Sequence, residues 1–363
     1  MQLRLERRAE QSRLMTVLSP VIAMALSIVT FFVIFWAMKI DPFGALYVYF
    51  IEKLTAWWSI QDLIVKMTPL VLIAVGLSIC YRTNVWNIGA EGQLAAGAIT
   101  GSILPVFFPD WQGPEVIALM LIMGVLGGMI YGAIPALLKI RFGANEILTS
   151  LMLVYVAGFL LDYLARGPWR NPAGFNFPNS RQFSEGQLLP VIAGQHVTLA
   201  IVFALIAAAA AWFMLHKTLT GFKIGVLGQA PRAGAFAGFS HNRMILVAFL
   251  ISGGLAGLAG ICEVAGPLGQ LRISVSPGYG FTAIIVAFLG RLNPLGAIVA
   301  GFVLALAFLG GEGIQSTYHL SEQISRVFQG VLLFFVLTCD TLIFYRVRLV
   351  GRRPAAVRAP AGA

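Results

Sequence analysis

The chain has 363 residues and a formal net charge of +10, and 58% of its residues are hydrophobic while only 11% are charged. An average soluble domain is about 45–50% apolar and about 25% charged, so this composition excludes an ordinary soluble domain and indicates a polytopic membrane protein. The three cysteines lack the spacing of a metal site or a disulfide framework. Basic and aromatic residues do not combine in a pattern typical of RNA binding. We therefore expect no metal, no cofactor and no nucleic-acid partner.

Apolar runs long enough to cross a bilayer as helices follow one another along most of the chain. We expect spans at roughly 15–38, 63–80, 84–108, 116–138, 145–164, 196–215, 244–265, 295–311 and 323–345. A shorter apolar run at 281–289, interrupted by Arg291 to Pro294, adds a weaker crossing. The predicted fold is an all-α membrane bundle of about ten transmembrane helices, and residues 15–345 form its one transmembrane domain.

Two segments between these spans have unusual compositions. Aromatic residues beside charges over 41–62 favour an interfacial helix, with an ordinary loop as the alternative. The polar stretch 165–195 is longer than most loops, and loops of this length are often functional.

The basic residues indicate the orientation of the bundle, because short cytoplasmic segments of membrane proteins are enriched in Lys and Arg. Placing both termini in the cytoplasm puts most of the 25 basic residues there. They lie in the N-terminal segment 1–14, the loop 216–243, the tail 346–363 and three short turns. The apolar run after residue 14 is too long for a signal peptide, so we expect it to be retained. The tail is rich in Pro and Ala, and we expect it to be disordered.

The most unusual polar stretch of the apolar region runs from Asn87 to Gln93 and contains Gly89 and Glu91. A charge at the centre of a membrane helix costs about 2.5–3.5 kcal/mol on insertion scales, so such a residue normally faces a protein interior or a wet path. The glycines can relax the helix and free backbone groups, which gives a lining of hydrogen-bond donors and acceptors. The alternative is a hydrogen-bonding patch that only holds helices together.

A faint internal symmetry relates the second to fifth spans to the last four. In each set the second element is broken by glycines near its start, Gly89 and Gly92 in one set and Gly278 and Gly280 in the other. The two sets run in opposite directions in the assigned topology. Paired broken helices in inverted halves point to a substrate site near the middle of the membrane.

Two further polar positions are candidates for the same path. Asn145 is suited to cap the helix that follows it and Glu146 to favour its N-terminal dipole. Glu146 and Thr149 also share a helix face that would line a passage. Glu263, near the outer end of the seventh span, marks either the mouth of a wet cavity or a simple loop carboxylate.

The loop 216–243 contains four basic residues and no Asp or Glu. Pro231 suits the first position of a short helix that ends at Gly238, and Arg232 and Phe236 lie four residues apart on one face of it. Because Arg and aromatic residues are favoured anchors in protein interfaces, we interpret this helix as a docking element for a cytoplasmic partner. A helix lying on lipid is the alternative.

The sequence contains no Gly-x-x-x-x-Gly-Lys-Ser/Thr loop for ATP and no His-Glu-x-x-His motif, and its four histidines lie far apart. We therefore expect no ATP hydrolysis through such a loop and no enzymatic activity of this chain's own.

Several of these motifs together are similar to those of a known family. Asn87-Ile-Gly-Ala-Glu-Gly-Gln93, Asn145-Glu-Ile-Leu-Thr149 and Gly225-x-x-Gly-x-x-Pro-x-Ala-x-x-x-Ala-Gly238 resemble the permeases of bacterial ABC importers, in the superfamily of branched-chain amino acid, ribose and nucleoside permeases. The segment from Gly280 to Gly290 is similar as well, and the likeness runs from about residue 63 to 340. The motif at 87–93 is most similar to the nucleoside (simple-sugar) branch. Gln229-Ala230 departs from the Glu-Asn or Ser-Asn of many relatives.

The resemblance implies an ABC importer permease fold with inverted halves, a multi-pass location in the bacterial inner membrane, and contact with membrane lipids. It also implies three partners, namely a separate ABC ATPase subunit, a second permease subunit in a heterodimeric pore, and a periplasmic or lipid-anchored solute-binding protein. The predicted substrate pathway comprises Asn87, Gly89, Glu91, Gln93, Asn145, Glu146, Thr149, Glu263 and Phe281. The predicted ATPase-coupling residues are Gly228, Pro231, Arg232, Phe236 and Gly238.

We therefore predict the permease subunit of an ABC importer that translocates purine nucleosides. An ABC permease for simple sugars is one alternative. A second is an ion-coupled secondary transporter with Glu91, Glu146 and Glu263 as its ionisable sites, and a third is a membrane scaffold that transports nothing.

Overall fold

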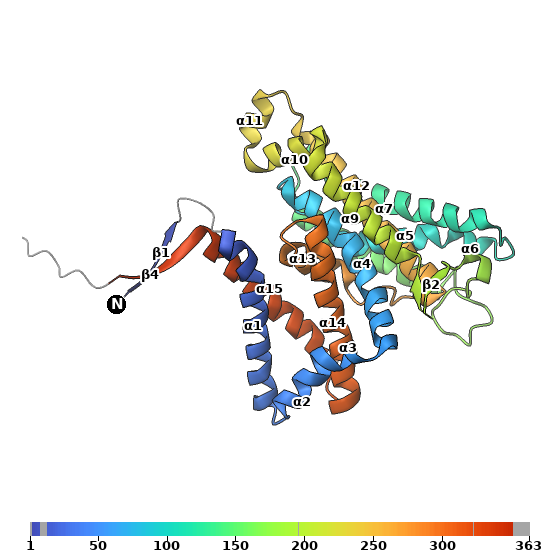
Figure 1. The fold of residues 1–363 in the computed structure, drawn as a ribbon. Helices are drawn as coiled ribbons and strands as arrows, with labels where there is room; N and C mark the ends of the chain where they lie inside the picture. The colour runs from blue at the N-terminus through green and yellow to red at the C-terminus, as the bar shows by residue number, and fades with distance from the viewer. Residues whose placement is uncertain (1, 8–12, 195, 322, 351–363) are drawn as a thin grey trace, which may run out of the picture. The chain divides into compact units, whose positions relative to one another are not determined.

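The computed structural model describes residues 2–7, 13–194, 196–321 and 323–350, and Figure 1 shows the order of its elements. The chain forms two compact units, Met1–Pro42 with Gly330–Ala363, and Phe43–Gln329. Helices account for almost all of the regular structure, which confirms the predicted all-α fold.

The first unit contains helix α1 (Arg13–Ala37) and a two-stranded antiparallel sheet. Strand β1 (Gln2–Arg7) pairs with β4 (Tyr345–Val350), with Gln2 opposite Val350 and Arg7 opposite Tyr345. We expected disorder from residue 346, but residues 346–350 belong to β4, where apolar and basic residues alternate with the period of a strand. Residues 351–363 of the predicted tail lie outside the described residues.

Seven helices in the described part of the chain are long and apolar enough to cross a membrane. They are α1, α4 (Trp57–Arg82), α7 (Pro114–Phe142), α8 (Glu146–Arg166), α9 (Ala200–Lys217), α12 (His241–Glu263) and α14 (Pro294–Tyr318). Most of their ends lie close to those of the predicted spans. The exceptions are α4, which begins before its predicted span, and α14, which ends after its predicted span.

The other three predicted crossings correspond to shorter or partly described helices. Helix α5 (Ala90–Gly101) has 12 residues and α13 (Tyr279–Leu289) has 11, so neither spans a hydrocarbon core of about 30 Å alone. Helix α15 (Gln323–Phe344) has a described apolar part of Gln323–Cys339. The total of ten crossings stays a prediction.

Short elements connect these helices. They are α2 (Pro42–Leu46), η1 (Tyr47–Glu52), α3 (Lys53–Thr55), α6 (Ile103–Phe107), η2 (Glu185–Gln187), β2 (Val191–Ala193), β3 (Val197–Thr198), α10 (Leu219–Gln229), α11 (Pro231–Phe236) and η3 (Val264–Leu268). The interfacial helix predicted at 41–62 is thus a series of short helical segments, and its last residues already belong to α4. In Figure 1, α11 and β2 lie at opposite ends of the helices between them.

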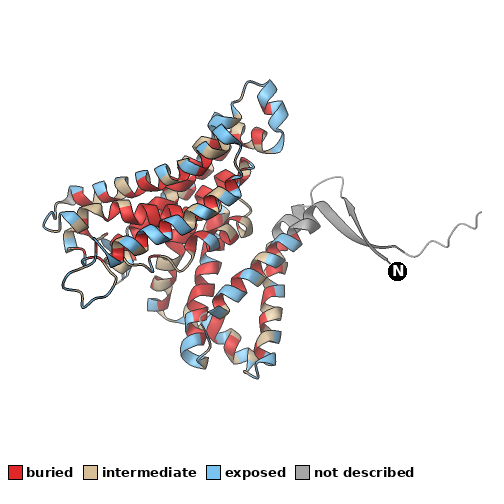
Figure 2. Ribbon diagram, turned by 180° about the vertical axis from the view of Figure 1, so that it is seen from behind, coloured by how far each residue is buried: buried red, intermediate tan, exposed pale blue. Residues whose placement is uncertain are grey.

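The core of the second unit forms where α4, α5, α7 and α12 meet. Helix α4 is apolar on every side and buried over most of its length, as expected of a helix surrounded by others. Figure 2 shows buried residues on the inward sides of packed helices and exposed residues on their outer sides. Helices α7, α8 and α9 instead bury only a minority of their residues, as helices at the edge of a membrane bundle do.

Glycines allow the central helices to touch. Gly124 and Gly128 of α7 pack on Gly257 of α12, and Gly97 of α5 packs on the same residue from another side. A Cβ atom at any of these positions would overlap backbone or branched side-chain atoms of the neighbouring helix. The glycine face of α7 is therefore a helix contact of the kind that small residues make in membranes.

Candidate functional site

Helix α4 ends at Arg82, and the chain runs without helical structure until α5 begins at Ala90. This break contains the first half of the polar motif found in the sequence. The Asn87 Nδ2 atom donates to Gln93 Oε1 at 2.9 Å and to Ser252 Oγ of α12 at 3.0 Å. In return, Asn87 Oδ1 accepts from Gln93 Nε2 at 3.1 Å and from the Gly89 N–H at 3.0 Å.

Asn87 and Gln93 are both fully buried, and they satisfy each other's amide groups. In this arrangement they hold the break in shape and attach it to α12, which favours the helix-holding interpretation for these two residues. Gly89 lies against the backbone of Ser150 in α8, where a Cβ atom would be too close to the Ser150 carbonyl oxygen. The Ile88 N–H also donates to Ser150 Oγ at 3.2 Å.

Glu91 is placed differently, because its side chain is only partly buried. Its Oε2 atom accepts a hydrogen bond of 2.6 Å from the backbone N–H of Gly280, in the first turn of α13. Gly280 packs so closely on Glu91 that a Cβ atom there would overlap the Glu91 backbone. The first turns of the two short helices α5 and α13 therefore meet at one carboxylate.

The second break precedes α13 and is also shaped by its residues. Gly278 has φ +104°, a conformation that favours glycine. Ser276 Oγ accepts from the N–H of Gly278 at 3.1 Å and from that of Tyr279 at 2.9 Å, so it satisfies the first backbone donor of the helix. The N-termini of helices carry partial positive charge, and Glu91 lies where two of them converge. Phe281, which follows Gly280, is 40% exposed.

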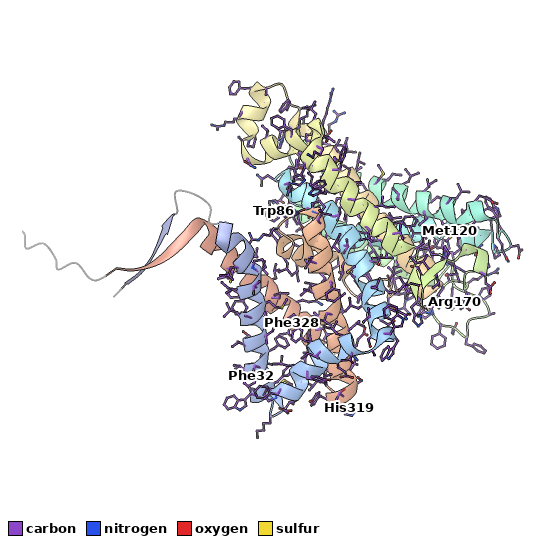
Figure 3. All side chains as sticks on the ribbon, viewed as in Figure 1. Phe32, Trp86, Met120, Arg170, His319 and Phe328 are labelled. Atoms are coloured by element: carbon purple, nitrogen blue, oxygen red, sulfur yellow. The ribbon has the colours of Figure 1, made fainter. Side chains whose placement is uncertain are left out.

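An aromatic cluster that sequence reasoning missed lies beside the first break. The ring of Phe288 in α13 stacks on Tyr81 at 5.4 Å between centroids and on Trp86 at 6.0 Å. Trp86, labelled in Figure 3, is 39% exposed, whereas Tyr81 is buried and donates its hydroxyl to the Asn87 carbonyl oxygen at 3.1 Å. A tryptophan between a helix end and a glycine-containing polar motif is the signal that was available in the sequence.

The start of α8 also adjoins the first break. Asn145 caps α8 by accepting from the N–H of Ile147 at 2.9 Å, as predicted. Glu146 is buried and forms an ion pair of 2.5 Å with Lys139 of α7. Its Oε1 atom accepts a long hydrogen bond of 3.5 Å from the backbone N–H of Trp86. Thr149 donates its hydroxyl to the Asn145 carbonyl oxygen at 3.0 Å, within its own helix.

Glu263 lies at the end of α12, buried, and interacts with Tyr279 at the start of α13. It lines a cavity of about 10 Å³, which is close to the room one water needs. A neighbouring cavity of about 390 Å³ is lined by residues that include Asp62, Glu185 and His196. Within the described residues, no group of His, Cys, Asp and Glu side chains is arranged to hold a metal ion.

The predicted docking segment forms two helices, α10 and α11. Pro231 occupies the first turn of α11, as the sequence predicted. The helix ends at Phe236, two residues before the predicted Gly238, which has φ +78°. Arg232 is exposed and Phe236 is 95% exposed, so both are accessible from outside the unit. Gly228 of α10 packs directly on the backbone carbonyl of Arg82, at the edge of the first break.

A family model described as "Branched-chain amino acid transport system / permease component" matches residues 59–337. Among curated relatives, a glucose ABC transporter permease protein of Haloferax volcanii is 33% identical over 328 residues, covering 87% of this chain and 86% of the relative. A nucleoside ABC transporter permease protein of Lactococcus lactis is 26% identical and covers 88% and 90%. A guanosine ABC transporter permease protein of Bacillus subtilis is 27% identical and covers 80% and 84%. No solved structure matches with significance.

Proposed function

Since this chain belongs to the family of branched-chain amino acid transport system permease components, we propose that it is the pore-forming subunit of an ATP-driven importer of nucleosides. Membership of the family makes it a multi-pass membrane permease, a transport component. The solute, the coupling to ATP and the roles of particular residues are the parts that we propose.

The observation that carries the proposal is the hydrogen bond between Glu91 and Gly280. It joins two short helices that start after breaks, and such helices border the solute in transporters with inverted repeats. We assign Glu91 and Phe281 to the path, because both are partly accessible. Asn87, Gly89 and Gln93 shape the first break. Glu146 and Thr149, with the cap at Asn145, support it from α8, and Glu263 borders the path beside Tyr279.

In the proposed transporter, ATP is hydrolysed by a separate partner chain. Helix α11 presents Arg232 and Phe236 to a separate ATPase chain, and Pro231, Gly228 and Gly238 give the segment its shape. The excess of basic residues supports a cytoplasmic location for this segment and for both termini. A solute-binding protein delivers the nucleoside on the other side, and a second permease subunit completes the pore.

Nucleosides are supported by the relatives named for nucleoside and guanosine transport, from two organisms. A simple sugar is the second candidate, and the 33% identity to a glucose permease favours it. Both candidates carry several hydroxyl groups, which suits a path with a carboxylate acceptor.

Uptake into membrane vesicles tests the proposal. Vesicles that contain the chain with its ATPase, second permease and binding protein are expected to accumulate labelled guanosine or adenosine only with ATP. Accumulation of glucose but not of nucleosides would show that the solute is a sugar and not a nucleoside. Uptake by the chain alone, indifferent to ATP, would overturn the ATP-driven mechanism in favour of an ion-coupled transporter.

The role of Glu91 is tested in the same vesicles. Glu91→Ala removes the acceptor for the Gly280 N–H, and we expect uptake to fall at least tenfold. Gln in place of Glu91 keeps an acceptor oxygen and is expected to retain part of the activity. If Glu91→Ala impairs assembly of the complex while flux per assembled complex is unchanged, the carboxylate is only a structural link.

A further inference from the structure

The three rings of Tyr81, Trp86 and Phe288 form one compact cluster. Their centroids are 5.2 to 6.0 Å apart, and the plane of Phe288 lies within 18° of that of Tyr81 and 26° of that of Trp86. Tyr81 is fixed by its hydrogen bond to the Asn87 carbonyl, and Asn87 is locked by Gln93. The buried side of the cluster is therefore rigid, while 39% of the Trp86 surface is open.

The open side of this cluster does not suit contact with lipid. Trp86 belongs to the non-helical stretch between α4 and α5, and non-helical backbone at membrane depth is either buried in protein or lines a water-filled cavity. Because 39% of the Trp86 surface is open, we infer that this stretch borders a cavity. Helices α5 and α6 together have 17 residues, which rise about 26 Å, so the stretch before α5 contributes to the crossing. Glu91, five residues beyond Trp86 and partly accessible, adds a carboxylate that lipid disfavours.

We propose that Trp86 and Phe288 bind a flat heteroaromatic ring of the transported solute, a nucleobase, by stacking on the open side of this cluster. The proposal rests on the proposed transport function and identifies the part of the nucleoside that this chain recognises. Stacking on aromatic side chains accepts any nucleobase, because every base has a π face. Glu91 retains acceptor sites beyond those used by Gly280 and Ser276, and these suit a ribose hydroxyl or a ring N–H.

Photolabelling of the assembled transporter tests where the ring lies. 8-Azidoguanosine is activated by light in the complex of this chain with its partner subunits, and the labelled peptides are identified by mass spectrometry. We expect label in the peptides that contain Trp86 or Phe288, and we expect excess guanosine to prevent it while excess glucose does not. Label confined to other peptides would overturn the proposal.

Matched variants test the contribution of the rings. Trp86→Leu and Phe288→Leu each keep an apolar side chain but remove a ring, and we expect each to lower specific labelling and guanosine uptake about tenfold. Trp86→Phe keeps a ring and is expected to restore most of both. Trp111→Leu removes a tryptophan with the same exposed fraction of 39%, in the turn between α6 and α7, and is expected to change neither.

The outcomes separate this inference from the proposed function. Wild-type vesicles without ATP-dependent uptake of any nucleoside contradict the proposed function itself. Normal uptake and labelling in both Leu variants contradict the stacking site alone. Loss of co-purification of the second permease in Trp86→Leu shows that the open ring is a subunit contact, and this overturns the site as well.

Discussion

Gly228 of α10 lies directly against the backbone carbonyl oxygen of Arg82, the last residue of α4. Arg82 in turn donates from Nε to the carbonyl oxygen of Leu292 at 2.8 Å, in the turn between α13 and α14. One residue therefore links the proposed docking segment to the first break and to the far end of α13. A displacement of α10 by an ATPase would reach both short helices through this contact.

Gly228→Ala should separate ATP hydrolysis from transport. A Cβ atom at 228 would overlap the Arg82 carbonyl oxygen, so α10 must move away from α4. We expect uptake in vesicles to fall about tenfold or more while the ATPase remains bound. Gly225→Ala, in the same helix, places its Cβ in open space and is the matched control. Equal uptake in the two variants would contradict the role of this contact.

Arg232 and Phe236 are predicted to anchor the ATPase. Both side chains are accessible on α11, and anchors of this kind dominate the binding energy of interfaces. Each change to Ala is expected to cost about 1–2 kcal/mol of binding, and the double variant should lose the ATPase on affinity purification. Leu219→Ala, at an exposed apolar residue of α10, is expected to retain it. Retention of the ATPase by the double variant would favour lipid as the contact of this helix.

The helices themselves were largely predictable from the sequence, because spanning length and hydropathy are local properties. The cap at Asn145 and the short helix after Pro231 also follow from local rules. Two breaks with glycines were expected from their positions in the two halves, and α5 and α13 do begin after them. The strand β4 was missed because its six residues adjoin a Pro- and Ala-rich tail.

The partners of the polar side chains were not predictable, because they come from distant parts of the chain. Nothing local distinguishes Glu91, bonded to Gly280, from Gln93, bonded to Asn87. The sequence left path and helix contact open for all of 87–93, and the structure separates the residues by burial. Phe288 became a candidate residue only because its ring stacks on Tyr81 and Trp86, which lie about 200 residues earlier in the sequence.

Gly257→Ala should destabilise the protein more than an ordinary helix substitution. Its Cβ atom would overlap the backbone of Gly124 and Gly128 in α7, which cannot move as a flexible side chain does. Overpacking of this kind costs about 1–3 kcal/mol, although alanine favours helices over glycine by about 1 kcal/mol. Gly158→Ala in α8 has open space around it and should leave the melting temperature in detergent unchanged or higher. A Gly257→Ala protein as stable as the control would contradict close packing at this point.

A double-mutant cycle at Asn87 and Gln93 measures the coupling free energy of the two hydrogen bonds between their side-chain amides. Asn87→Ala leaves Gln93 and Ser252 buried without their partner, and each single change is expected to cost about 1–3 kcal/mol of unfolding free energy in detergent. Because the two amides bond each other twice, the double variant should cost clearly less than the sum of the singles. Additive costs would mean that each residue has separate partners, as expected if both faced a solute path. Thr55→Ala, whose hydroxyl bonds to the carbonyl oxygen of Glu52 three residues earlier at an exposed position, controls for the loss of a polar group and should change stability little.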